Sequence, residues 1–139
     1  MIVALDHVQV AAPPGSEVEA RRFYGELLGL REIPKPDGLA ATGGAWFECG
    51  AQELHIGIED PFEPARKAHP GFAVRDDAML DAVAERLTAA GVSVKWDDRL
   101  EGVRRFYAED PWGNRLELGV AARPAASTSE SPGLPRTAA

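Results

Sequence analysis

Hydrophobic and polar residues alternate in several short segments of the chain, which is the period of strands with one buried face. This pattern predicts strands at residues 5–10, 30–33, 45–49, 53–58, 71–75, 92–96, 103–108 and 115–120. Apolar residues recur at helical spacing in two other segments, 16–28 and 77–90. Gly29 and Gly91 follow these segments, in the place where a left-handed residue often ends a helix, and Ser16 and Asp76 or Asp77 are the expected N-caps.

The predicted elements occur twice in the same order, strand, helix and three strands. Four pairs of residues are each separated by 62 positions: His7 and His69, Gly29 and Gly91, Leu54 and Leu116, Gly57 and Gly119. This spacing indicates an internal repeat. We therefore expect an α+β fold of two tandem βαβββ modules with curved half-barrel sheets, covering residues 1–60 and 65–121 of one domain, 1–121. The segment 122–139 is rich in Ala, Pro, Ser and Thr, which predicts disorder.

The same spacing relates all three histidines of the chain to metal-ligand positions. His7 corresponds to His69, and His55 corresponds to Glu117. The alternation places these four side chains on the sheet faces that the helices leave uncovered. Three imidazoles and one carboxylate suit a divalent transition metal such as zinc, nickel, iron or manganese. For any one histidine the alternative is a hydrogen-bonded structural residue, and Glu53 is a competing carboxylate beside His55.

The amino-acid composition argues against some classes of binding partner. The formal net charge is −7, with a pI of about 4.9, which argues against nucleic acid or an anionic membrane as the main partner. The first residues lack the basic region of a signal peptide, and no apolar run reaches membrane-spanning length. A single cysteine, Cys49, allows no intramolecular disulfide. We expect a cytoplasmic protein with a small-molecule ligand.

Four segments carry a resemblance to a known family: 5–10 (LDHVQV), 23–30 (FYGELLGL), 68–74 (AHPGFAV) and 110–118 (DPWGNRLEL). Together with the repeat, they resemble the vicinal oxygen chelate superfamily, which includes glyoxalase I, extradiol dioxygenases, fosfomycin-resistance transferases and bleomycin-resistance proteins. The resemblance implies metal ligands at His7, His55, His69 and Glu117. Glyoxalase I usually has a carboxylate where His55 stands, and the fosfomycin enzymes use ligands like His7, His69 and Glu117 only.

The resemblance also implies a function. It suggests a metal-dependent lyase, isomerase or transferase that acts on a small molecule with vicinal oxygens, with Glu117 as a possible base, in a homodimer whose sites lie between subunits. Trp46, Arg105 and Trp112 are candidates for substrate binding, although tryptophans in such positions are more often packing residues and an arginine like Arg105 is more often a solvated strand charge. The alternative functions are a metal-free protein that sequesters a cationic drug, as bleomycin-resistance proteins do, and a structural domain with a vestigial site.

Overall fold

The computed structural model describes residues 1–121, which form two modules joined by the segment 59–70. Module 1 contains β1 (His7–Ala12), α1 (Glu17–Ala20), η1 (Arg21–Leu27), β2 (Arg31–Ile33), η2 (Asp37–Thr42), β3 (Ala45–Cys49) and β4 (Gln52–Ile58). Module 2 contains β5 (Gly71–Val74), α2 (Asp77–Ala89), β6 (Lys95–Asp97), β7 (Arg105–Glu109) and β8 (Arg115–Val120). The expectation of disorder at 122–139 concerns residues outside this description.

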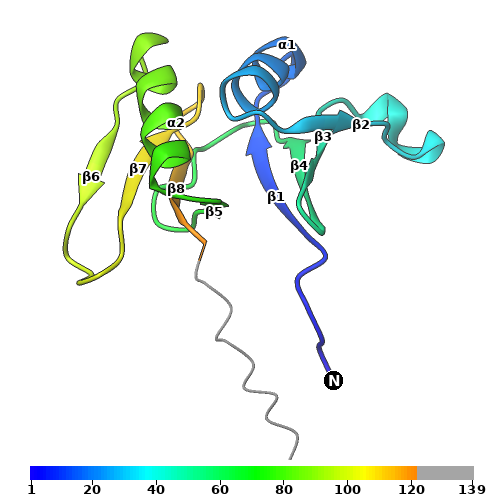
Figure 1. Cartoon of the computed structure of the whole chain (residues 1–139). Helices are drawn as coiled ribbons and strands as arrows, with labels where there is room; N and C mark the ends of the chain where they lie inside the picture. Colours follow the sequence, from blue (N-terminus) through cyan, green and yellow to red (C-terminus); the bar gives the residue numbers. More distant parts are fainter. Residues whose placement is uncertain (122–139) are drawn as a thin grey trace, which may run out of the picture.

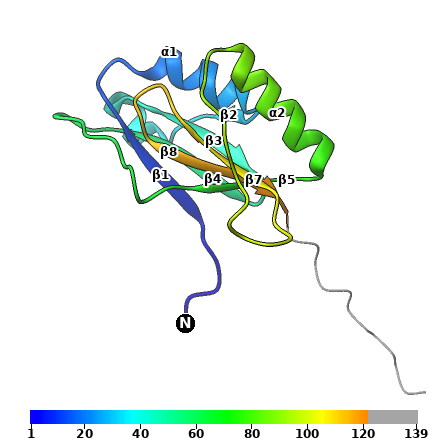
Figure 2. The same cartoon turned by 90° about the vertical axis from the view of Figure 1, so that its left-hand side faces the viewer.

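Each module forms one four-stranded sheet, with strand order β1-β4-β3-β2 in module 1 and β5-β8-β7-β6 in module 2. The first strand of each module pairs in parallel with the last, and the other pairs are antiparallel. The helices of both modules lie on the same side of the two sheets (Figures 1 and 2). The predicted α+β fold of two βαβββ modules is confirmed. No helix in residues 1–121 has the length and apolar character needed to cross a bilayer.

The register of the parallel pairs preserves the repeat, because Gln9 lies opposite His55 just as Gly71 lies opposite Glu117. In the hairpins β3–β4 and β7–β8, the pairing register of one module differs by one residue from that of the other. Trp46 lies opposite His55, and an offset of 62 would place Ala108 opposite Glu117, but Tyr107 stands there. The turn at 110–114 is longer than the turn at 50–51, and this difference shifts the antiparallel partner of β8.

The first helix differs from its prediction. It begins as α1 and continues as the π-helical segment η1, in which the amide of Leu28 donates to the carbonyl of Phe23 five residues earlier. The wider turn lets the adjacent rings of Phe23 and Tyr24 both face the core, where each is almost fully buried. Ser16 does not cap this helix through its side chain, whereas the carboxylate of Asp76 caps α2 by accepting from the amide of Met79.

A buried polar cluster joins the two modules. The hydroxyl of Tyr24 on η1 donates to Asp110 over 2.8 Å, and the amide group of Asn114 donates to Asp110 over 2.7 Å. Asn114 also donates to the carbonyl of Ala11 on β1 and accepts from the amide of Ala65 in the linker. Burial and the neighbouring Asp110 raise the pKa of Tyr24 well above its ordinary value, which keeps the phenol protonated as a donor.

We expect Asn114→Ala to lower the free energy of unfolding by about 3 kcal/mol, because it leaves several buried polar groups without partners. Tyr24→Phe removes one hydrogen bond and should cost about 1 kcal/mol. Urea denaturation of both variants measures the difference. A loss for Asn114→Ala no larger than that for Tyr24→Phe would contradict the central place of Asn114 in the cluster.

Candidate functional site

Two of the predicted ligands, His7 and His55, lie together on the sheet of module 1. Their rings are stacked, with centroids 4.4 Å apart and planes 15° from parallel. The indole of Trp46 stacks on the other side of His55, with a centroid distance of 3.7 Å and an angle of 2°. The three rings form a column on the face of the sheet that the helices do not cover. Trp46, a candidate for substrate binding, therefore has one face against His55.

The hydrogen bonds of these two histidines differ. Nδ1 of His7 lies 2.8 Å from the carboxylate of Asp6, which can only accept, so Nδ1 carries the proton and Nε2 presents a lone pair when the ring is neutral. In His55 it is Nε2 that lies 2.7 Å from the carboxylate of Glu53. The side chain of His7 is 48% exposed, whereas that of His55 is 6% exposed. His7 therefore has the nitrogen that is open to a ligand, and His55 is enclosed.

The other two predicted ligands, His69 and Glu117, lie together in module 2. Nδ1 of His69 donates to the carbonyl of Lys67 over 2.9 Å, which directs the Nε2 lone pair of the neutral ring to a carboxylate oxygen of Glu117, 3.2 Å away. A lone pair and a carboxylate repel each other unless a proton or a metal cation lies between them. His7 and His69 thus show the same arrangement, with Nδ1 held by an oxygen and Nε2 available, which is how a histidine ligand is oriented toward a metal.

Arg105 lies beside this pair, but its guanidinium has two carboxylate partners within the sheet. It donates to Asp97 over 2.7 Å and to Glu117 over 3.1 Å. Burial raises the pKa of Glu117, but its polar contacts with His69 and with the cationic Arg105 outweigh this and lower it below its ordinary value. Bonds from Arg99 and Arg105 likewise depress the pKa of Asp97. Glu117 is therefore an ionised acceptor at neutral pH.

The sequence prediction missed one residue at this site, Tyr107. It lies opposite Glu117 on β7, and its ring meets that of His69 edge-on, with centroids 5.7 Å apart. The guanidinium of Arg115 lies 4.1 Å from the centre of the Tyr107 ring. The signal was present in the sequence, because Tyr107 alternates with Arg105 and therefore shares its face.

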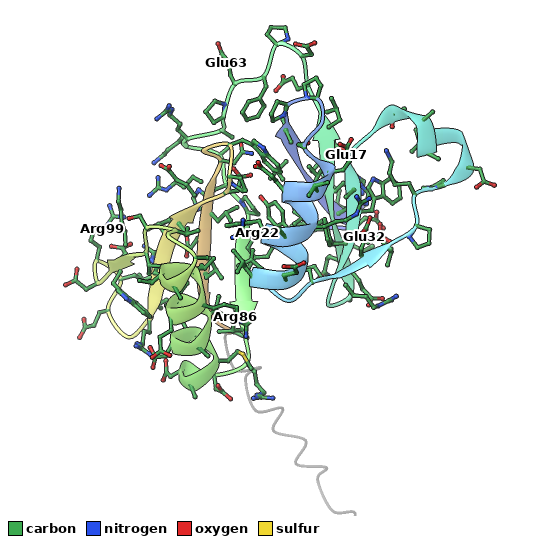
Figure 3. The ribbon with its side chains drawn as sticks, turned by 90° about the horizontal axis from the view of Figure 1, so that it is seen from above. Glu17, Arg22, Glu32, Glu63, Arg86 and Arg99 are labelled. Carbon is green, nitrogen blue, oxygen red and sulfur yellow. The ribbon has the colours of Figure 1, made fainter. Side chains whose placement is uncertain are left out.

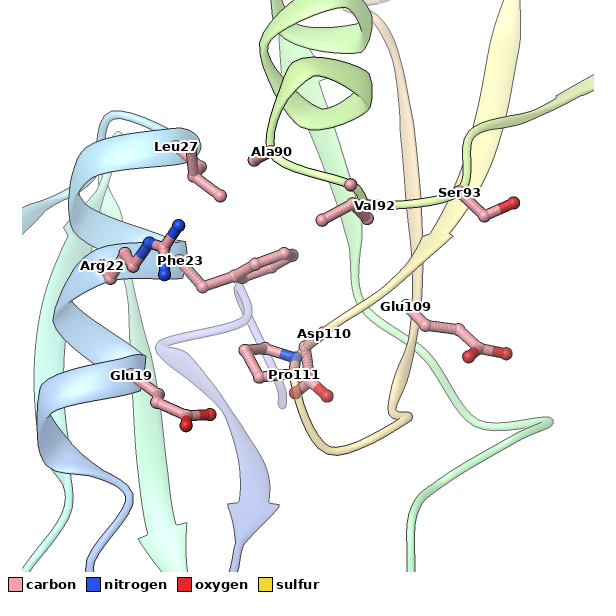
Figure 4. A pocket seen from close by; sticks show the side chains of 11 residues that line it. Glu19, Arg22, Phe23, Leu27, Ala90, Val92, Ser93, Glu109, Asp110 and Pro111 are labelled. Atoms are coloured by element: carbon pink, nitrogen blue, oxygen red, sulfur yellow. The ribbon is translucent and has the colours of Figure 1, made fainter.

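Trp112 lies apart from the predicted ligands, in the turn between β7 and β8. It packs against the edge of the core, and its amide donates to Asp110. Close to this turn, a cavity of about 420 Å³ lies between η1 and the end of α2 on the helix side of the molecule (Figure 4). Phe23, Val92 and Pro111 are among the residues that line it, and none of the four predicted ligands does.

The structure therefore brings the four predicted ligands together as two pairs, one on each sheet. Within residues 1–121, no group of three or more His, Cys, Asp or Glu side chains is placed to hold one metal ion. Each pair offers fewer than the three protein ligands that a catalytic transition-metal site usually has, so a metal centre built from these residues would need ligands from both pairs.

Comparison with known proteins agrees with this architecture. The family model described as the glyoxalase/bleomycin resistance protein/dioxygenase superfamily matches residues 4–118. The chain belongs to this superfamily. Among curated proteins, none matches the chain.

Solved structures of the glyoxalase superfamily match over most of the chain. A glyoxalase family protein from Bacillus anthracis is 49% identical, with a TM-score of 0.82, over 88% of this chain and 98% of that protein. Two more distant structures share the fold. Lactoylglutathione lyase from Agrobacterium tumefaciens is 24% identical, with a TM-score of 0.66, over 84% of this chain and 92% of that protein. The fosfomycin resistance protein FosX from Listeria monocytogenes is 22% identical, with a TM-score of 0.69, over 88% of this chain and 96% of that protein.

We expect Arg105→Gln to raise the pKa of Glu117, because the substitution removes a cation and a hydrogen-bond donor from its carboxylate. A pH titration of the side-chain carboxyl carbon by NMR measures the shift. Arg104→Gln is the matched control, since Arg104 is the preceding residue and pairs with Asp81 and Asp77 on α2 instead. An equal shift of Glu117 in both variants would contradict the role assigned to Arg105.

Proposed function

We propose that the protein is a metal-dependent enzyme that acts on a small molecule with two adjacent oxygens, by lyase, isomerase or transferase chemistry. The observation that carries the proposal is that the carbonyl of Lys67 holds Nδ1 of His69 while Nε2 of the same ring lies 3.2 Å from the carboxylate of Glu117, an arrangement that a metal ion bound to both groups would satisfy. Membership of the glyoxalase superfamily supports the same conclusion.

His7, His69 and Glu117 would hold the metal, with His55 as a fourth ligand. In both His7 and His69, an oxygen holds Nδ1 and Nε2 is available to a metal. His55 would bind through Nδ1, or would release its bond to Glu53 to bind through Nε2. The donor set fits zinc, nickel, iron(II) or manganese(II). Bound there, the metal would polarise a carbonyl oxygen of the substrate and make an adjacent C–H bond more acidic.

Glu117 is the residue proposed to move the proton. Its carboxylate is ionised at neutral pH and, once displaced from the metal, would accept a proton from the substrate carbon. Arg105 would hold the free oxygen of this carboxylate in place, and Tyr107 would limit the approach of water on the side facing β7. Trp46, which stacks on His55, is proposed to border the bound substrate, whereas Trp112 packs at the edge of the core, apart from the four proposed ligands.

We infer that the complete site forms between two copies of the chain. The two ligand pairs lie on separate sheets, and β1 and β5 are the edge strands of those sheets, so each has one unpaired edge. The segment before β1 exposes four large apolar side chains, Met1, Ile2, Val3 and Leu5, which is unusual unless another surface covers them. A homodimer in which module 1 of one copy faces module 2 of the other would bring His7 to His69 and Glu117.

The alternative function is a metal-free protein that binds and sequesters a small cationic drug. The net charge of −7 favours it. The charge near the candidate site does not, because the side chains of Arg66, Lys95 and Arg115 line a cavity beside Tyr107. The alternative gains support if protein purified without a histidine tag contains no first-row metal and its melting temperature does not change when metal is added.

We expect His69→Ala and Glu117→Gln each to lose most of the bound metal while retaining the fold, as measured by elemental analysis and circular dichroism of untagged protein. Glu109→Gln is the matched control for the carboxylate, because Glu109 lies on the same face of the sheet outside the proposed ligand set. Unchanged metal content in His69→Ala would contradict the assignment.

A mixing experiment tests the two-chain site. Neither His7→Ala nor His69→Ala alone should bind metal well, but a heterodimer of the two variants contains one site built from an intact module 1 and an intact module 2. After complete subunit exchange, an equal mixture should recover about a quarter of the wild-type metal content, given the two-fold symmetry of most dimers. Absence of any recovery in a mixture shown to contain heterodimers would contradict the shared site.

A further inference from the structure

In module 2, a cavity of about 320 Å³ lies beside Tyr107, whose ring meets that of His69 edge-on. Its lining includes three basic residues, Arg66, Lys95 and Arg115, around the ring of Tyr107, and one carboxylate, Glu109. In the described part of the chain, none of the three cations has a carboxylate within 4.0 Å. Three neighbouring positive charges with one counter-charge repel each other, and an anion would relieve that repulsion.

Strand pairing and a backbone hydrogen bond bring the three basic residues to the same cavity. Lys95 and Tyr107 are opposite each other on β6 and β7, so their side chains leave the same face of the sheet. Arg115 is the first residue of β8, where its amide donates to the carbonyl of Ala65 over 2.9 Å. This bond fixes the linker against the sheet and brings the next residue, Arg66, to the cavity. The guanidinium of Arg115 lies over the face of the Tyr107 ring, in a cation–π contact.

The position of the cavity relates it to the proposed reaction. Arg115 and Glu117 are two residues apart on β8 and point to the same face, so their backbone positions are separated by roughly 7 Å. A small molecule that reaches Glu117 at one end can therefore place its other end among the cations. Arg105 on the same face has its guanidinium engaged by Asp97 and Glu117, which leaves the three cavity cations as the available anion partners.

We propose that Arg66, Lys95 and Arg115, arranged around Tyr107, bind a phosphate or carboxylate group of the substrate. The role of this basic cavity in binding the substrate rests on the proposed function. Three cations against the single charge of Glu109 favour a doubly charged group, so phosphate should bind more tightly than acetate. The guanidinium groups supply paired donors suited to either oxyanion, and Lys95 adds a point charge.

Titration of the full-length protein with inorganic phosphate and with acetate, followed by ¹H–¹⁵N NMR, tests the site. We expect saturable shifts at the amides of Lys95, Tyr107 and Arg115. Lys95→Gln and Arg115→Gln should each weaken phosphate binding about tenfold, the loss typical of one charge-assisted contact. Arg22→Gln is the matched control, because it changes the charge equally on η1, on the helix side of the molecule, and should change the affinity by less than about twofold (Figures 3 and 4).

Metal content measured on the same samples separates this inference from the proposed function. Tighter binding of phosphate supports a phosphate group on the substrate, and tighter binding of acetate supports a carboxylate. Equal weakening by Arg22→Gln, or phosphate binding that survives Lys95→Gln and Arg115→Gln but is lost in His69→Ala, would overturn the anion site and leave the metal centre standing. Weakened phosphate binding in protein that takes up no metal would retain the anion site and overturn the enzyme proposal.

Discussion

Parallel pairing between the first and last strands of each module is the interaction on which the candidate site depends. The pairing of Gln9 with His55 and of Gly71 with Glu117 brings each preceding histidine diagonally next to the ligand position on the last strand. A slip of one residue would turn one partner of each pair into the core. The buried positions on either side, such as Leu54 and Leu116, oppose that slip because it would expose them. Burial of the core therefore also aligns the polar groups of the uncovered face.

The distribution of charge on that face differs from the charge of the whole chain. The guanidinium of Arg105 forms ion pairs with Asp97 and Glu117, which lowers the pKa of both carboxylates. On the same sheet, Lys95 and Arg115 line a cavity, and neither has a carboxylate partner in the described residues. A chain with an overall negative charge thus contains a local basic site. For a substrate, the local field matters more than the net charge, since charges beyond about 8–10 Å are largely screened in salt.

The modules are joined by a shared hydrophobic core and by the polar cluster of Tyr24, Asp110 and Asn114, rather than by a continuous sheet. This connection lies near the helices and the turn at 110–114, so it joins the modules without pairing β1 to β5. β1 and β5 each keep one unpaired edge in the described residues, and each sheet carries one pair of the predicted ligands. In the proposed dimer, a second copy would bring the ligand pair of one sheet to the pair of the other.

Much of the architecture was predictable from the sequence because it depends on local rules. Alternation located the strands, glycines with left-handed backbones end both helical segments at Gly29 and Gly91, and the 62-residue repeat predicted two like modules. The repeat also selected His7, His55, His69 and Glu117, which the structure places on the uncovered faces in two pairs. The π-helical turn was not predictable, since it depends on where Phe23 and Tyr24 find space in the core.

Only the tertiary structure decided how the polar groups are used. The longer turn at 110–114 shifted the hairpin register and placed Tyr107, not Ala108, opposite Glu117. Strand pairing gave Arg105 two carboxylate partners and enclosed His55 between Trp46 and His7. Periodicity determines which face a side chain occupies, but its neighbours on that face depend on the register and on the path of the intervening loops. For this reason the sequence determined the two modules and the four ligand-type residues, whereas their separation into two pairs and the basic cavity beside them were determined by the packing of strands distant in the chain.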